Sequence, residues 1–354
     1  MSRPKKTEFG APIPQVFIDG RVDTGLIRAS LQLAEESGFR GAWTQDQVIG
    51  DVPLLECIDL LAYAAACTER LRLGVSVIVF PVRDPVLLAK QIGSLDHLSG
   101  GRIDLGLGLG PPAVAANFYS SFGTAYEERV RRFTEGLAVM KALWTEQRIS
   151  FDGEFQQLNS TAMEPKPLQR PHPPVIFGGQ HEHALRRAAL LADGYMGAGP
   201  TTTREFGHHV GLLRDALQAC GRDTDNFPIS KRVYLHVDND AAKAKRVLDE
   251  FFEERYPWMI KTNPDFVADI CVWGPPEQCV QGLHEVVAAG AEMIVLNPIQ
   301  DFVPQLERLG ADVTVDVETQ MEIEAEASGK RRYVVSRVSL DCNVTNLQKD
   351  RKND

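Results

Sequence analysis

The segment LRLGVSVIVFPVRDPVLLAKQIGSLDHLSGGRIDLGLGLG, residues 71–110, changes its hydrophobic pattern twice. Its Val- and Ile-rich start, residues 71–79, predicts a strand, and residues 85–98 carry apolar side chains at helical spacing behind Pro85. The pair Gly100-Gly101 ends that helix, and residues 103–109 predict a second strand. A strand, a helix and a strand at this spacing form a βαβ unit, so the sequence predicts a parallel sheet.

The same alternation continues on both sides of this segment. Upstream it predicts helices over residues 24–37 and 53–68 and a strand over residues 41–46. Downstream it predicts strands over residues 174–177, 194–196, 229–237 and 293–296, alternating with helices over residues 183–191, 204–219, 275–289 and 302–309. With EFGAPIPQ at residues 8–15, about eight strands are counted, each followed by a helix. We therefore expect an α/β fold, a single (β/α)8 TIM barrel over residues 1–315.

Two insertions and a tail interrupt this order. Residues 111–174 contain a predicted helix over residues 126–144 and a hairpin turn at Asp152-Gly153. Residues 251–273 carry several aromatic side chains and are predicted to be irregular. Barrel enzymes place their chemistry on the loops after the strands, so Pro111–Ser121 and Phe251–Trp273 are candidate lids. Residues 316–354 lose all periodicity, and we expect a C-terminal tail outside the barrel.

Composition narrows the class of protein. The 354 residues are 44% hydrophobic and 24% charged, with a net charge of −10. This acidic balance argues against nucleic acid or a membrane surface as a partner, and no apolar run approaches the roughly 20 residues of a membrane helix. The six cysteines form no C-x-x-C pair, which argues against a zinc site and a disulfide framework. Pro12, Pro14 and Asp19 break the only candidate signal peptide, so we expect a cytoplasmic location.

A glycine pair follows one predicted strand directly. Gly178 and Gly179 come after Val175-Ile176-Phe177 and precede a helix, so backbone N–H groups and the positive end of the helix converge there. That arrangement suits a phosphate group. The alternative is that the two glycines only make a tight turn between strand and helix.

Two further strands carry unusual small residues. In residues 104–110, DLGLGLG, glycines alternate with leucines, which leaves one face of the strand open for something flat. Ser76 lies inside a Val/Ile strand that ends at Pro81, which predicts either a bulge that touches a ligand or a buried strand with one tolerated serine. Asp46 ends a barrel strand, where it either serves the active site or caps the turn.

Other catalytic patterns are missing from the sequence. Neither G-x-G-x-x-G after the first strand nor G-x-x-x-x-G-K-[ST] occurs, which argues against a Rossmann fold and a P-loop. His181, His183, His208 and His209 lack metal-ligand spacing, so we predict no metal site. No G-x-S-x-G elbow indicates a hydrolase.

Taken together and in order, these segments resemble the bacterial luciferase-like family. The resemblance includes residues 71–110, the helix end at Glu135–Trp144, FDGEF, EPKPLQRPHPPVIFGG and ALRRAALLADGYMG, and it runs from about Glu8 to Ala311. The family comprises flavin-dependent monooxygenases and oxidoreductases that depend on the deazaflavin coenzyme F420, on a TIM barrel. The form in which EPKPLQRPHPP precedes the phosphate strand is often associated with the deazaflavin.

The resemblance also implies roles for individual residues. A bulge with a non-prolyl cis peptide at the end of the third strand would support the cofactor ring, which implies Ser76 and Val77. Gly108 would let the ring approach. The phosphate would lie at Gly178 and Gly179, with Phe177 and Gln180 beside it and Met196 and Gly197 completing the wall.

Two departures bear on the reaction. Several deazaflavin enzymes have Asp-His at the end of the second strand, whereas this chain has Asp46-Gln47, and glutamine is no general acid or base. Many also carry a glutamate after the fourth strand, where this chain has Pro111-Pro112. Proton abstraction at this place is therefore disfavoured, while hydride transfer survives because the cofactor supplies that chemistry.

We therefore predict an F420-dependent oxidoreductase that transfers hydride to or from a small organic substrate, with Asp46 and Gln47 as polar contacts. The alternatives are an FMN-dependent monooxygenase that uses oxygen and a non-catalytic flavin-binding or deazaflavin-binding protein. A phosphate-binding aldolase or isomerase barrel needs a lysine or paired carboxylates at strand ends, and this sequence places none there. The resemblance further implies a homodimer.

Overall fold

The computed structural model describes residues 7–17, 20–110 and 116–310 of the chain. The predicted tail over residues 316–354, its boundary with the barrel and the Pro111-Pro112 pair lie outside the described residues.

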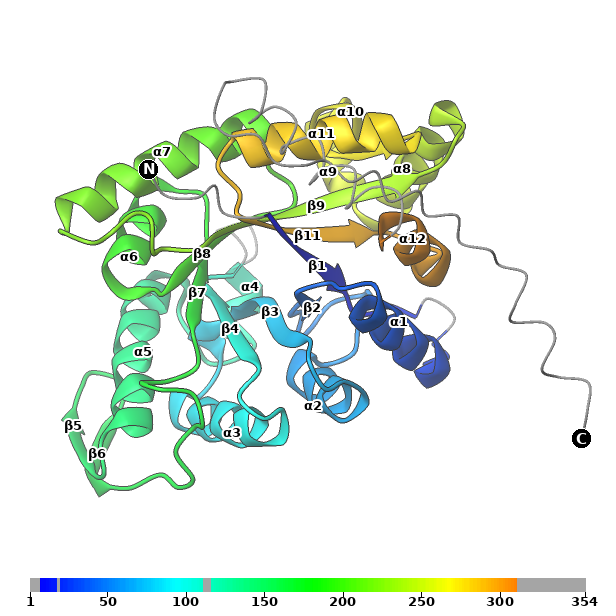
Figure 1. Cartoon of the computed structure of the whole chain (residues 1–354). Helices are drawn as coiled ribbons and strands as arrows, with labels where there is room; N and C mark the ends of the chain where they lie inside the picture. The colour runs from blue at the N-terminus through cyan, green and yellow to red at the C-terminus, as the bar shows by residue number, and fades with distance from the viewer. Residues whose placement is uncertain (1–6, 18–19, 111–115, 311–354) are drawn as a thin grey trace, which may run out of the picture. The chain divides into compact units, whose positions relative to one another are not determined.

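Within these ranges, eight parallel strands close into a barrel, which confirms the predicted fold class (Figure 1). Each strand pairs with the next, and β9 pairs with both β8 and β11 to complete the ring. In barrel order the strands are β1 (Glu8–Pro12), β2 (Gly41–Thr44), β3 (Arg72–Val79), β4 (Ile103–Gly108), β7 (Val175–Gly178), β8 (Gly194–Gly197), β9 (Ile229–Val237) and β11 (Met293–Pro298).

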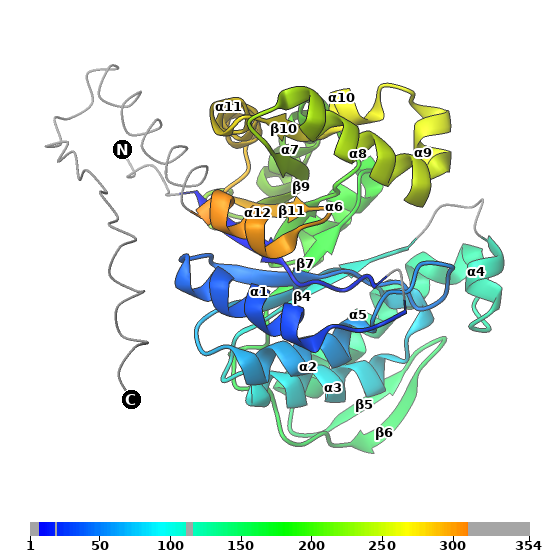
Figure 2. The same ribbon diagram turned by 90° about the vertical axis from the view of Figure 1, so that its right-hand side faces the viewer.

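Helices surround the barrel. In both views α1, α2 and α3 lie on one side of the strands, and α7, α8 and α11 lie on the other (Figures 1 and 2). The helices that follow barrel strands are α1 (Thr24–Glu36), α2 (Cys57–Cys67), α3 (Pro85–Leu98), α5 (Arg129–Thr145), α6 (Glu182–Leu191), α7 (Thr203–Ala219), α11 (Pro276–Ala288) and α12 (Phe302–Arg308). None of the described helices is long and apolar enough to cross a lipid bilayer.

Local sequence explains where several helices begin. The side chain of Asp84 accepts a hydrogen bond from the N–H of Leu87, and Pro85 occupies the first turn of α3. Thr202 and Glu205 form a reciprocal capping box at the start of α7. The helix predicted over residues 53–68 begins later, at Cys57, because the Glu56 side chain accepts hydrogen bonds from the first turn of α2 and so sets its start.

The centre of the barrel is built around Trp43. A Cβ added at Gly10 would lie 2.8 Å from Nε1 of Trp43, and one at Gly74 would overlap the ring, so neighbouring strands need glycine where the indole passes. Met196 and Val295 pack against the same ring. Trp43 therefore fills the centre of the barrel.

Both insertions are ordered where they are described. The hairpin predicted around Asp152-Gly153 is present as β5 (Ile149–Asp152) and β6 (Gln157–Thr161), which lie away from the barrel beyond α5 (Figure 1). The helix predicted from residue 126 starts with a 3-10 turn, η3 (Tyr126–Glu128), before α5. A short helix, α4 (Ala116–Ser120), precedes it.

The prediction of an irregular segment over residues 251–273 is wrong. These residues form the end of α8 (Ala241–Arg255), then α9 (Pro257–Thr262), α10 (Phe266–Ile270) and β10 (Val272–Gly274), which pairs with the end of β9. Pro257 occupies the first turn of α9, so it starts a new helix after α8 ends. The insertion is thus a helical layer.

Candidate functional site

The end of β3 bulges as predicted. Its register with β4 shifts between Val75 and Ile78, and the peptide between Ser76 and Val77 is cis. This irregularity turns the Val77 side chain toward glycines of two neighbouring strands. A Cβ at Gly108 would lie 2.5 Å from Cγ2 of Val77, and a Cβ at Gly178 would lie 3.0 Å from its Cγ1. The bulge and the glycines are therefore one packed unit.

The packing of Val77 explains why glycines alternate with leucines in β4. The open face expected along residues 104–110 is filled by Val77, whose Cγ1 would also lie 3.0 Å from a Cβ at Gly106. Gly108 thus accommodates the valine, and its predicted approach to a cofactor ring stays a prediction. What remains for a ligand is the main chain of the bulge and the Ser76 side chain.

The glycine corner lies at the end of β7. Gly179 has φ +150°, and a Cβ there would lie 2.8 Å from Cβ of Ala184, so both backbone and space require glycine. The Tyr195 hydroxyl donates to the carbonyl of Gly179 at 2.8 Å, and Gln180 Nε2 donates to Thr201 Oγ1 at 2.5 Å. The corner is thereby tied to the loop after β8, beside the first turn of α6.

The side chains of Phe177, predicted beside the phosphate, and Met196, predicted in the wall, pack away from the corner. The Phe177 ring is buried against Phe133 of α5, with ring centroids 4.8 Å apart, so it faces the helix layer and only its backbone reaches the corner. Met196 packs into the core against Trp43. Gly197 makes room for a neighbour, because a Cβ there would lie 2.6 Å from Phe206 and 3.0 Å from Cδ of Lys231.

Lys231 is buried behind this wall. Its Nζ donates to the carbonyls of Ala198, of Gly199 at 3.3 Å and of Arg232 at 3.0 Å. Burial lowers the pKa of Lys231 to about 7. The ammonium therefore holds the loop after β8 through backbone carbonyls.

Asp46 is fully occupied by partners in the protein. Its Oδ2 accepts from the N–H of Val79 at 2.8 Å, and its Oδ1 lies 2.6 Å from Nη2 of Arg83. The predicted contact with a ring or substrate stays a prediction, while the structure gives this carboxylate the task of holding the end of β3. Gln47, next in the chain, is partly exposed and lines a cavity of about 260 Å³ together with Phe17, Val48, Val52, Leu54 and Leu55.

Among the described residues, Asp46 also belongs to a group of three side chains whose spacing could hold a metal ion. Ligand atoms of Asp46, Glu56 and Cys57 lie within 4.8 Å of one another. The Arg83 guanidinium already lies among them, 2.9 Å from Glu56 and 3.8 Å from the Cys57 sulfur. Burial raises the pKa of Cys57, which keeps the thiol protonated. The cluster is thus an ion-pair network with a guanidinium as its cation.

Sequence reasoning missed the polar face of β9. Arg232 reaches across the barrel from β9, and its Nη2 donates to Ser76 Oγ at 2.5 Å and to the Thr44 carbonyl at 3.4 Å. Two positions on, Tyr234 lies on the same face of the strand. The signal was present in SKRVYLHV, where polar side chains occupy every second position of a buried strand.

Some buried polar atoms at this level have no partner among the described residues. They include Nε of Arg232, Nε1 of Trp43 and Oδ1 of Asn297. Asn297 is in register with Tyr234, two residues beyond Val295, which contacts Trp43, so it faces the same interior. Such atoms are rarely left without a partner. Nε1 of Trp43 lies against Gly10 in the core, so Nε of Arg232 and Oδ1 of Asn297 leave one donor and one acceptor for a ligand.

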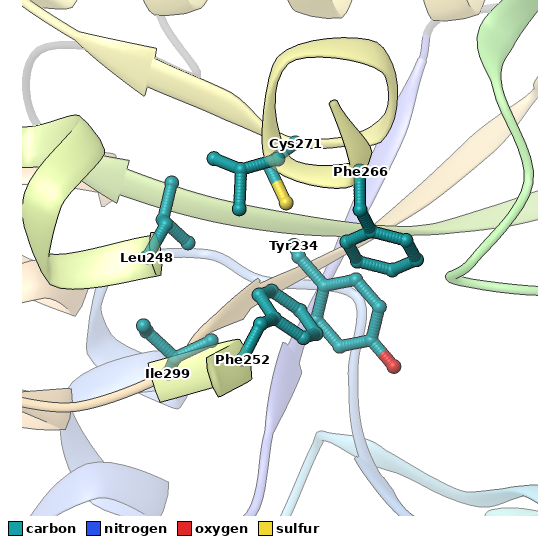
Figure 3. Packing of buried hydrophobic residues seen from close by; sticks show 7 residues of the cluster. Tyr234, Leu248, Phe252, Phe266, Cys271 and Ile299 are labelled. Carbon is teal, nitrogen blue, oxygen red and sulfur yellow. The ribbon is translucent and has the colours of Figure 1, made fainter. Parts of the chain in front are cut away.

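Aromatic side chains from the insertion cover Tyr234. Its ring lies 5.1 Å from that of Phe252, which is 4.8 Å from that of Phe266 (Figure 3). Cys271, Leu248 and Ile299 complete this cluster. Burial raises the pKa of Tyr234, so the phenol stays protonated. The helical layer α8–α10 therefore makes a dry apolar wall next to the polar face of β9.

A closed parallel barrel with a bulged third strand, a glycine corner after the fifth and a polar patch between them defines a TIM-barrel protein. The sequence profile of the family described as luciferase-like monooxygenase matches residues 19–293. The chain belongs to this luciferase-like family, as its sequence pattern implied.

Relatives with known activities use two different cofactors. The chain is 32% identical over 177 residues to an FMNH2-dependent dimethylsulfone monooxygenase of Pseudomonas putida, which covers 48% of this chain and 47% of that protein. It is 30% identical over 225 residues to an F420-dependent glucose-6-phosphate dehydrogenase of Kineococcus radiotolerans, covering 60% of this chain and 64% of that one. The chain thus matches less than two thirds of either relative.

A solved structure supports the fold. The monooxygenase RslO1 from Streptomyces bottropensis superposes with a TM-score of 0.76 at 22% identity, covering 87% of this chain and 99% of that one.

Proposed function

We propose that the chain is an oxidoreductase that binds coenzyme F420 or FMN at the barrel mouth and transfers hydride between its ring and a small organic substrate. The observation that carries this proposal is the polar patch of Ser76, Arg232 and Asn297 beside the bulge of β3. The pyrimidine edge of a flavin-type ring presents both acceptors and a donor, which complements the unpartnered Nε of Arg232 and Oδ1 of Asn297 there.

The cofactor's phosphate would lie at the glycine corner. Gly179 leaves no side chain between a ligand and the start of α6, and the positive end of that helix favours an anion. Gln180 and Tyr195 hold the corner to the loop after β8 and fix its shape. Gly178, Gly197 and Met196 shape the surroundings through packing rather than through polar contact.

The protein's own contribution is orientation and exclusion of water. When bound, the ring supplies hydride chemistry. The bulge and Arg232 would fix its plane, the wall around Tyr234 and Phe252 would keep water from it, and the cavity lined by Gln47 offers space for a small organic molecule. No acid or base is needed at Gln47 for hydride transfer alone.

A second candidate is an FMN-dependent monooxygenase. The apolar wall of α8–α10 favours it, because a reduced flavin that reacts with oxygen needs protection from water. The resemblance to the FMNH2-dependent enzyme supports it as well. Under either proposal the protein acts as a cytoplasmic homodimer. Size-exclusion chromatography with light scattering tests the oligomeric state.

The deciding experiment is a titration of the purified chain with FMN and with F420, each oxidised and reduced, followed by fluorescence quenching. Tight binding of F420 alone, with turnover on a panel of alcohols and aldehydes, supports the hydride transferase. Oxygen consumption with reduced FMN supports the monooxygenase. Binding without any turnover identifies a cofactor-binding protein, and absence of binding overturns the whole proposal.

A further inference from the structure

Arg232 is a charged side chain placed inside the barrel. β9 and β3 are separated in the sheet by β11, β1 and β2, so the bond from Nη2 to Ser76 Oγ crosses the interior. The residue is 4% exposed. Its guanidinium therefore contacts the Ser76 side chain of the bulge inside the barrel.

Among the described residues, no carboxylate lies within ion-pair distance of this guanidinium. Its recorded partners are the Ser76 hydroxyl and the Thr44 carbonyl, and its buried Nε has none. Burial lowers the pKa of Arg232, yet arginine stays charged at any physiological pH. A buried unpaired charge is among the most costly features of a protein interior, so its retention points to an anion that arrives with a ligand.

The neighbouring Lys231 differs from Arg232 in its hydrogen-bond partners. Lys231, the preceding residue, is equally buried and has several carbonyl acceptors. Arg232 points to the opposite face of β9 and keeps donors free. A planar guanidinium donates several parallel hydrogen bonds. It therefore suits an anion whose charge is shared between oxygen and nitrogen atoms better than the compact ammonium of a lysine does.

We infer that Arg232 is the receptor for the negative charge that the cofactor ring gains on reduction, so that this site binds the reduced ring more tightly than the oxidised one. The inference rests on the proposed function. A hydride carries one proton and two electrons, so a neutral oxidised flavin that accepts it becomes an anion unless a second proton reaches N1. A fixed cation beside the bulge holds that charge and lowers the pKa of the ring N–H.

The test compares wild type with Arg232→Gln in anaerobic titrations with FMN and with dithionite-reduced FMN. We expect wild type to bind reduced FMN at least about tenfold more tightly than FMN, which raises the midpoint potential by about 30 mV for a two-electron couple. Arg232→Gln should lose this preference through weaker binding of the reduced form. Arg232→Lys, which keeps the charge without the fork, should retain part of it.

Different outcomes separate this inference from the proposed function. If wild type shows the preference and Arg232→Gln keeps it, or loses both affinities equally, the role of Arg232 is wrong while the function stands. If wild type binds neither form, both fail. If Arg232→Gln does not fold, the absorption of reduced FMN bound to wild type between pH 5 and 8 decides: a ring that stays anionic below the pKa of free reduced FMN supports the inference, and a neutral ring overturns it.

Discussion

Asp46 and Arg83 form an ion pair of 2.6 Å whose carboxylate side chain is 2% exposed. The other oxygen of Asp46 accepts the N–H of Val79, the last residue of β3. One side chain thus joins the end of β2 to the end of β3 and to the segment that leads into α3. It lies next to the bulge, so it fixes the position of the end of β3.

Asp46→Asn should therefore destabilise the fold without creating a new charge in the mouth. We expect a loss of about 1–3 kcal/mol in the free energy of unfolding, because Arg83 keeps only Glu56 as a carboxylate partner. Urea unfolding measures it. Glu56→Gln is the matched control and should cost less, since Glu56 is more exposed. Equal losses in the two variants would contradict this account.

The glycines around Val77 predict a compensating pair of substitutions. Gly108→Ala places a Cβ 2.5 Å from Cγ2 of Val77 and should cost about 1–3 kcal/mol of stability through overpacking. It should also weaken cofactor binding, because the bulge moves. Adding Val77→Ala removes the methyl groups and should restore part of the loss, which a double-mutant cycle on unfolding free energies detects.

Gly211→Ala is the control for that cycle. Gly211 lies in α7, and a Cβ there meets nothing within 4 Å. The change should raise stability by roughly 0.5–1 kcal/mol, as alanine does within a helix. Additive effects of Gly108→Ala and Val77→Ala would show that the two residues do not share one packing unit.

Periodicity was enough to predict the barrel. The helix over residues 85–98 and the strand over residues 229–237 have the predicted bounds, because caps, glycine stops and buried alternation are local properties. The prediction that residues 251–273 are irregular is wrong, because they form α9, α10 and β10, and Pro257 occupies the first turn of α9. A proline in the sequence is compatible both with the end of one helix and with the start of the next, and only the structure shows which applies.

The site was predictable only in part. Ser76 and the glycine corner could be found from small residues in apolar strands, since small residues leave main chain accessible. The alternation in SKRVYLHV indicated a polar face that includes Arg232, but its partner could not be predicted, because only the closed barrel brings Arg232 to Ser76. Asp46 shows the reverse case. Its position at a strand end predicted a role in the active site, but Arg83, which is distant in the sequence, forms an ion pair with it.

Gly179→Asp should weaken cofactor binding at the phosphate corner. A carboxylate there repels the phosphate, and we expect FMN affinity to fall by at least about tenfold, or 1.4 kcal/mol. Riboflavin, which has no phosphate, should be affected much less. Gly179→Ala separates charge from geometry, because it carries the same contact with Ala184 and the same φ of +150°. Equal loss of FMN and riboflavin in Gly179→Asp would place the phosphate elsewhere.

Lys231 makes stability depend on pH near neutrality. Its pKa is lowered to about 7 in the folded chain by burial, from an ordinary value of 10.5. The groups that act on it electrostatically are Cys271 and Glu205, which raise this pKa, and Arg232 on the opposite face of β9, which lowers it further. His209 of α7 also lies within electrostatic range. Between these two pKa values the unfolded chain binds more protons than the folded one, so stability rises with pH there.

Lys231→Met removes this dependence. Below about pH 7 the buried ammonium costs wild type its full desolvation penalty, at about 1.4 kcal/mol per unit of pKa difference, so the variant should be more stable there by a few kcal/mol. That advantage should shrink steadily as pH rises toward 9, where wild-type Lys231 is neutral when folded. Urea unfolding at several pH values measures it, with the surface change Lys243→Met as a control whose effect stays constant. An advantage of Lys231→Met that does not change with pH would show that the folded and unfolded chains bind the same number of protons at this amine, so that burial does not lower its pKa.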